Sequence, residues 1–224
     1  MHPNPAFRKR PETQSLECAR ERGFGTLAVN GPGGPLLSHI PFLLSDDGQQ
    51  VNLHLVRSNP IVALLATPQP AMIAVSGPDS YISPDWYGVP DQVPTWNYVA
   101  IHLRGTLQLA PPEALHAMLD RLTAAFETRL DPKAPWTSTK MSDGLMDRMM
   151  RAIVPCTMTL TLTKVDLTWK LGQNKPDGVR TAAAGQVAAF GIGNDTSTLA
   201  ALMLGGGIDR PPGQSLCRSL MAQQ

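Results

Sequence analysis

Apolar and polar residues alternate along several stretches of this chain, with the period of a β-strand that buries one face. The clearest stretch is residues 96–109. Its odd positions carry Asn97 and five aliphatic side chains, whereas its even positions carry aromatic, polar and charged ones. The odd face is predicted to be core, and the even face to meet solvent, a ligand or a partner. A buried Asn97 amide needs hydrogen-bond partners, so it either braces the neighbouring loop or meets a ligand.

Similar patterns define the other elements. Alternation predicts strands over residues 24–30, 36–44, 51–55, 71–76 and 157–171. Helical spacing and capping residues predict helices over residues 12–22, 60–66, 112–130, part of 140–151 and 177–204. Residues 77–95, with several prolines and glycines, are expected to form a long loop.

The order of these elements predicts the fold class. The strands follow one another with hairpin-like spacing instead of alternating with helices, which favours a mainly β fold, an antiparallel barrel with peripheral helices. Residues 1–175 are expected to form this barrel domain, with inserted helices at about 111–152. Residues 176–224 are expected to form a helical extension that ends in a loose tail.

Composition narrows the function classes. With 19 Lys and Arg against 18 Asp and Glu, the formal charge of +1 excludes binding to nucleic acid through bulk positive charge. Three cysteines without a CxxC pair argue against a disulfide framework or a zinc site. The N-terminal residues form no apolar signal segment, and no apolar run approaches about 18 residues. The expected location is the cytoplasm.

The junction at Arg57-Ser58-Asn59-Pro60 is the first candidate for chemistry. A strand ends and a helix begins there, and backbone N–H groups at such a point attract anions that an arginine can bind as well. These residues could hold a phosphate group. The alternative is a capped helix with a solvated arginine.

Two further candidates lie at the ends of strands. Five of the seven Trp and Tyr residues fall between positions 81 and 98, and Thr95, Trp96 and Asn97 could stack on a planar ring and bind its edge. The alternative is an apolar plug that closes a barrel end. Lys170-Leu171-Gly172-Gln173-Asn174 gathers polar side chains where another strand ends, although a simple turn rich in Gly and Asn is the favoured explanation.

Histidines offer a weaker hypothesis. His39, His54 and His102 lie on different predicted strands, but their spacing does not indicate that they converge on a metal ion. The chain contains no GxGxxG, P-loop, GxSxG or HExxH motif. No metal site and no catalytic acid or base is therefore predicted.

Taken in order, several motifs resemble the PaiB-like family, described as FMN-binding negative transcriptional regulators. The resemblance covers about residues 1–180 and is most specific at Val93-Pro94-Thr95-Trp96-Asn97-Tyr98 followed by His102 and Gly105. The other matching motifs are Met1-His2-Pro3 with Phe7, Phe24-Gly25-Thr26, Ser38-His39-Ile40-Pro41, His54 with Arg57-Ser58-Asn59-Pro60, Gly77-Pro78, Tyr81 to Tyr87, and Lys170 to Asn174. Gly172 stands where the family has a serine.

The resemblance implies a split β-barrel that works as a homodimer with FMN at the subunit interface. Arg57 and Ser58 would hold the FMN phosphate, and Ser38, His39 and His54 would lie on neighbouring strands. The remaining expected cofactor-binding residues are Thr95, Trp96, Asn97, Lys170, Gln173 and Asn174.

Three functions remain open at this point. The first is a flavin-binding transcriptional regulator, for which direct DNA binding finds no support in charge or motif. The second is an FMN-dependent oxidoreductase acting on a small molecule, which rests on fold analogy. The third, a haem-binding module with His39 or His102 as axial ligand, has the least support.

Overall fold

The computed structural model describes residues 2–205, and inside its last strand the side chains of residues 162–165 lie outside the description. The described chain divides into two compact units. Unit 1 contains residues 2–21, 76–101 and 166–205, and unit 2 contains residues 22–75 and 102–165. None of the helices in this described part has the length and apolar content needed to cross a bilayer.

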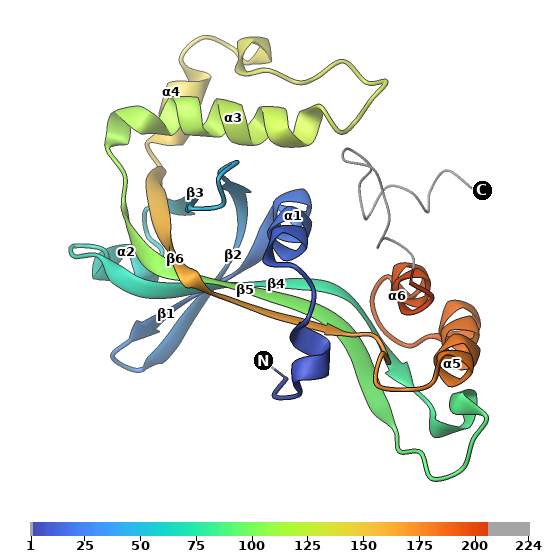
Figure 1. Ribbon diagram of the computed structural model, residues 1–224. Helices are drawn as coiled ribbons and strands as arrows, with labels where there is room; N and C mark the ends of the chain where they lie inside the picture. Colours follow the sequence, from blue (N-terminus) through green and yellow to red (C-terminus); the bar gives the residue numbers. More distant parts are fainter. Residues whose placement is uncertain (1, 206–224) are drawn as a thin grey trace. The chain divides into compact units, whose positions relative to one another are not determined.

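Six strands form a closed barrel in the order β1-β2-β3-β6-β5-β4 (Figure 1). The strands are β1 (Phe24–Gly31), β2 (Gly34–Leu44), β3 (Gln50–Val56), β4 (Gln69–Ile82), β5 (Thr95–Leu109) and β6 (Ile153–Lys170). β1 pairs antiparallel with β2 and β4, and β3 pairs antiparallel with β2 and β6. The predicted mainly β, antiparallel barrel with peripheral helices is confirmed.

Alternation of buried and exposed residues accounts for the core of unit 2. In β3 the side chains of Val51, Leu53 and Leu55 are buried, while those between them are partly exposed. Each strand therefore gives one apolar face to the barrel interior, as period-two patterning requires. β5 continues the pattern with buried Leu103 and Leu107.

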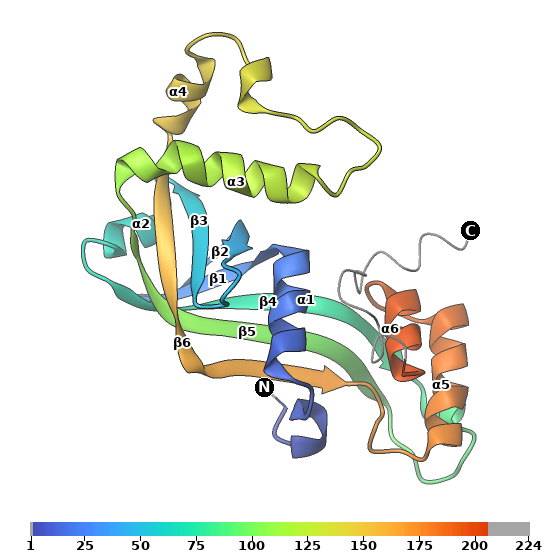
Figure 2. The same ribbon diagram turned by 45° about the horizontal axis from the view of Figure 1, so that its top comes forward.

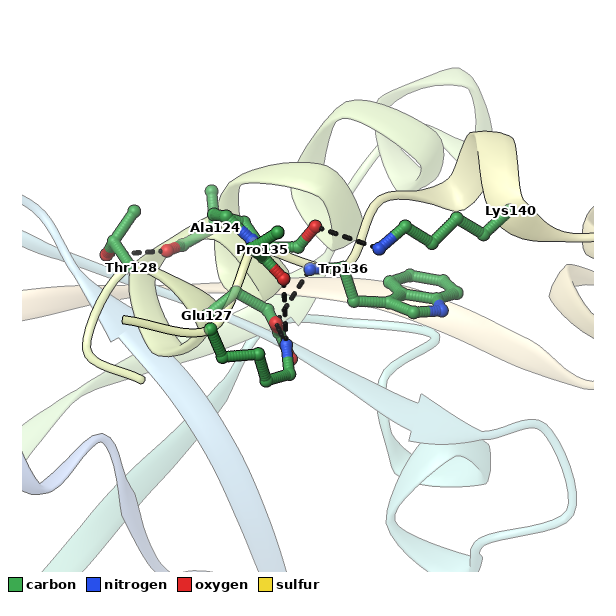
Figure 3. Close-up of polar contacts among 8 residues, drawn as sticks. Ala124, Glu127, Thr128, Pro135, Trp136 and Lys140 are labelled. Atoms are coloured by element: carbon green, nitrogen blue, oxygen red, sulfur yellow. Dashed lines mark hydrogen bonds and ion pairs between the residues drawn. The ribbon is translucent and has the colours of Figure 1, made fainter. Parts of the chain in front are cut away.

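Three α-helices lie in unit 2, namely α2 (Pro60–Leu64), α3 (Leu115–Glu127) and α4 (Leu145–Met150). The segment between α3 and α4 is fixed by the Glu127 carboxylate, which accepts hydrogen bonds from the Trp136 N–H at 2.7 Å and from Lys133 Nζ (Figure 3). The hydrogen bond from Lys133 is the largest cause of a lowered pKa of Glu127. Lys140 Nζ also donates to the Pro135 carbonyl at 3.2 Å.

Unit 1 contains α1 (Glu12–Arg22), α5 (Asp177–Phe190) and α6 (Thr196–Met203), and the last two lie side by side (Figure 2). Their small and aliphatic faces form an apolar core with the ends of the long strands. Trp169 lies in this core with 1% of its surface exposed. Its Nε1–H donates to Ser15 Oγ of α1 at 3.0 Å, so the indole fills volume without burying an unpaired donor.

The predicted loop over residues 77–95 is wrong in its first part, because β4 continues to Ile82 and a 3-10 helix covers Pro84–Tyr87. A Cβ on Gly77 would lie 2.8 Å from Val99 Cβ, so this glycine permits β4 to approach β5 closely instead of ending the strand.

The helix expected over residues 177–204 is two helices, α5 and α6. They separate where Gly193 has a φ of +156° and Asp195 a φ of 50°. The helices expected over 60–66 and 112–130 are shorter than predicted, and a helix lies within 140–151 as expected, at Leu145–Met150. The loose tail expected after residue 205 lies outside the described residues, and the division of the chain at residue 175 stays a prediction.

Candidate functional site

A cavity of about 240 Å³ lies in unit 1. Four of the cofactor-binding residues expected from the family resemblance line it, namely Thr95, Asn97, Lys170 and Asn174. Thr95 and Asn97 lie at the start of β5, Lys170 ends β6, and Asn174 lies in the turn that follows. The structure thus brings together the start of β5 and the end of β6. The side chains of Thr95 and Lys170, which are 75 residues apart in sequence, are in hydrogen-bond contact.

Two lysines supply the charge of this cavity. Lys170 Nζ donates to Thr95 Oγ1 at 2.5 Å, and partial burial lowers the pKa of Lys170. Lys175 Nζ donates to Gln92 Oε1 at 2.5 Å and lies 5.2 Å from the centre of the Tyr87 ring. Each ammonium group therefore contacts neutral oxygen or an aromatic face.

The Asn97 side chain is 1% exposed, as its place on the apolar face of β5 predicts. Its Nδ2 donates to Met203 Sδ at 3.6 Å. A thioether sulfur is a weak acceptor, so this contact satisfies the buried amide poorly. Asn97 lies in the cavity wall, and its contact with a ligand stays a prediction.

Sequence reasoning missed the other lining residues, which are His2, Asn4, Phe7, Tyr87, Val93 and Lys175. The N-terminal three reach the cavity because the His2 N–H donates to Thr168 Oγ1 at 3.3 Å. The Asn4 N–H donates to His2 Nδ1 at 3.1 Å. The density of aromatic residues near Tyr87 and the resemblance at Met1-His2-Pro3 were the available signals.

Trp96 and Gln173 are not among the residues that line the cavity. Trp96 is 46% exposed and packs edge-on against Tyr81, with ring centres 6.3 Å apart. The Gln173 amide accepts from the Leu171 N–H at 2.8 Å and donates to the Ala6 carbonyl at 3.2 Å, which fixes the turn after β6. Contact of these two residues with FMN stays a prediction.

The second group of predicted residues lies in unit 2, and Arg57 is its charged member. Its Nε donates to the Arg151 carbonyl at 3.1 Å and its Nη2 to the Ile153 carbonyl at 3.2 Å, while its backbone N–H donates to the Ala152 carbonyl at 2.8 Å. A guanidinium has five N–H donors, and the contacts with the described residues use two of them, so Arg57 could also donate to a ligand. The backbone thus holds this exposed side chain in one orientation.

Ser38 and Ser58 lie at the same junction. Ser38 Oγ accepts from Asn59 Nδ2 at 3.1 Å, and Asn59 Oδ1 caps α2 by accepting from the Ile61 N–H at 3.0 Å. Ser58 is exposed in the turn that the Asn59 N–H closes on the Val56 carbonyl at 2.8 Å. The helix cap considered from the sequence therefore exists, and it is Asn59 that links the Ser38 hydroxyl to the start of α2.

The histidines of this group differ in environment. His39 is exposed on β2, where it pairs with Thr26 of β1. His54 is half-buried on β3, and burial lowers its pKa. Its Nδ1 is buried without a hydrogen-bond partner among the described residues. His54 is therefore neutral at physiological pH and adds no positive charge to the junction.

Other reactive groups are scarce. No cluster of three or more His, Cys, Asp or Glu side chains suited to a metal ion occurs within residues 2–205 where side chains are described. Burial raises the pKa of Cys156 to about 12, so its thiol stays protonated and inert.

Comparison with known proteins identifies the family. The family model described as "Putative FMN-binding domain" matches residues 1–162. "Protease synthase and sporulation protein PAI 2" of Bacillus subtilis is 28% identical over 158 residues, which cover 70% of this chain and 74% of that protein. "Uncharacterized protein YKL070W" of Saccharomyces cerevisiae is 38% identical over 103 residues, covering 41% of this chain and 61% of that protein.

Solved structures show the same fold. The FAD and heme binding protein from Mycobacterium smegmatis aligns with a TM-score of 0.53 at 19% identity, covering 82% of this chain and 80% of that chain. The conserved hypothetical protein Rv2991 from Mycobacterium tuberculosis aligns with a TM-score of 0.52 at 17% identity, covering 79% of this chain and 94% of that chain. These alignments confirm the predicted split-barrel fold.

Proposed function

The chain belongs to the family of FMN-binding domains, and from this membership we propose that it is a flavin-binding homodimer that regulates gene expression. The family model matches residues 1–162, so FMN is the cofactor of this chain. The similarity to the Bacillus subtilis protein supports the regulatory part, because that protein's name links it to protease synthesis and sporulation. We propose that FMN, or its redox state, biases the dimer toward one activity. The cytoplasmic location remains a prediction.

The donor set of the chain fits FMN. The cofactor carries a flat ring system with a polar edge and a phosphate dianion. The cavity of unit 1 offers two ammonium groups, amides and a hydroxyl beside the apolar walls of Phe7, Tyr87 and Val93. Its volume of about 240 Å³ is below the roughly 300 Å³ at which small-molecule pockets usually begin, so it suits part of the cofactor.

We assign FMN binding to the two groups of residues described above. In unit 2, Arg57 and Ser58 would bind the phosphate, while Ser38, His39 and His54 would flank the cofactor. In unit 1 the cofactor contacts would come from Thr95, Trp96, Asn97, Lys170, Gln173 and Asn174. Bound FMN supplies the redox chemistry, and the protein supplies binding, orientation and electrostatics.

Absorbance titration of the purified protein with FMN tests the proposal directly. We expect saturable binding in the micromolar range with a shifted flavin spectrum, and a mass by light scattering of twice the monomer. Absence of flavin binding at high micromolar FMN would remove the basis of the proposed function. If the protein binds FMN as a monomer, only the proposed homodimer would be contradicted.

The regulatory role needs its own measurement. We expect FMN-loaded protein to retain a specific promoter fragment at physiological salt, either alone or with a partner protein. Retention that ignores sequence and vanishes with added salt would contradict direct regulation. Rapid reduction of bound FMN by NAD(P)H with turnover onto an acceptor would instead favour an oxidoreductase.

Replacing Arg57 with alanine should weaken FMN binding at least tenfold, or about 1.4 kcal/mol, because the phosphate loses its charged ligand. Fluorescence titration of FMN measures the change. Arg121→Ala, which removes an exposed arginine from α3, is the control and should bind FMN like the wild type. Unchanged affinity in a folded Arg57→Ala variant would show that the phosphate lies elsewhere.

A further inference from the structure

Positive charge dominates the cavity of unit 1. Lys170 and Lys175 both line it, and none of its ten described lining residues is acidic. The whole chain carries a formal charge of only +1, so this cavity differs from the protein average. Two like charges in one cavity repel each other unless an anion lies between or beside them.

Unlike these lysines, several other cations of the described chain pair with carboxylates. Lys133 pairs with Glu127, Arg8 with Asp166 at 3.6 Å, and Arg180 with Asp177 at 3.0 Å. Lys170 and Lys175 contact only the Thr95 hydroxyl, the Gln92 amide oxygen and aromatic rings among the described residues. Their charge is therefore not neutralised within the part of the chain that the structure describes.

The walls of the cavity strengthen the attraction for an anion. Lys170 Nζ lies 6.0 Å from the centre of the Phe7 ring, and Lys175 lies over Tyr87, which is buried. Apolar walls lower the local dielectric constant and concentrate the field of the two charges. The buried Asn97 amide adds a donor whose present acceptor is a thioether sulfur. A ligand oxygen would be a far better acceptor for it.

We propose that this cavity is an anion-binding site, which takes a phosphate or carboxylate group carried by a small molecule. The lysines provide the charge, and Asn97 provides a neutral donor. Two molecules could supply this anion. One is FMN itself, through its phosphate, and the other is a separate small molecule that binds beside the cofactor. Both sources rest on the proposed FMN binding, and the first would place the FMN phosphate at the lysines instead of at Arg57.

Titration of the cofactor-free protein with inorganic phosphate, followed by phosphorus NMR, tests the site without FMN. We expect saturable binding in the millimolar range, weakened about tenfold by Lys170→Met or Lys175→Met, which keep side-chain length and remove the charge. Lys9→Met is the matched control, because Lys9 is exposed in unit 1 and does not line the cavity. It should leave phosphate binding unchanged.

Comparison of FMN with riboflavin, which lacks the phosphate, separates the two sources. If FMN supplies the anion, the preference for FMN over riboflavin should collapse in the lysine variants, and free phosphate should compete with FMN. If a separate molecule supplies it, FMN-loaded protein should still bind phosphate through the lysines, and only Arg57→Ala should abolish the preference.

Phosphate binding that is absent up to about 10 mM, or equal in wild type and lysine variants, would overturn the anion site. Normal FMN binding in the same samples would leave the proposed function intact. Lysine-dependent phosphate binding by a protein that never binds FMN would support the anion site and contradict the proposed function. The two proposals therefore fail separately.

Discussion

Gly105→Ala should lower the free energy of unfolding by about 3 kcal/mol, the upper end of the usual cost of overpacking. A Cβ at this position of β5 would lie 2.2 Å from the Thr159 carbonyl oxygen and 3.0 Å from the Leu160 Cα in β6. Both are backbone atoms of a strand in the same unit, so no side-chain rotation can relieve the clash. The two strands would have to separate.

Gly185→Ala is the matched control, because the same methyl group is added where nothing lies within 4 Å. Gly185 is exposed within α5, and alanine there should stabilise the protein by about 0.5–1 kcal/mol through its higher helix propensity. Urea unfolding followed by circular dichroism measures both variants. A Gly105→Ala variant as stable as the wild type would show that β5 and β6 do not approach as closely as described.

Residue patterns predicted the elements well where one face of a strand is buried. The parity of residues 96–109 placed Asn97 in the core, where the structure has it, because alternation reports burial directly. The prediction was wrong at Gly77, whose function is a close approach between strands. A glycine in a loop and a glycine under a neighbouring side chain look the same in one sequence.

The candidate site was predictable in part. Thr95 and Lys170 were expected from motifs, and the structure places their side chains in hydrogen-bond contact. The contribution of His2 depends on the N-terminal segment reaching Thr168, 166 residues away, which no local pattern encodes. Arg57 likewise has partners 94 and 96 residues away. These partners are backbone carbonyls, so no residue type in the sequence indicates them.

Trp169→Ala should destabilise the protein by about 3–5 kcal/mol, the range for removing a large buried aromatic side chain. Trp169 is 1% exposed. It immediately precedes Lys170 in the sequence, and Lys170 lines the cavity. The substitution leaves a large void in the core of unit 1 and strips the Ser15 hydroxyl on α1 of its donor. The Arg10 guanidinium, 5.4 Å from the ring centre, loses its aromatic contact as well.

Two further variants make this prediction specific. Trp169→Phe keeps most of the ring volume and loses the Nε1–H donor, so it should cost about 1–2 kcal/mol, well below the alanine variant. Trp96→Ala makes the same truncation at a tryptophan of the same unit that is 46% exposed, and it should cost less than about 1 kcal/mol. Denaturant unfolding ranks the three. Equal losses for Trp96→Ala and Trp169→Ala would contradict the burial of Trp169, whereas the expected order would support it.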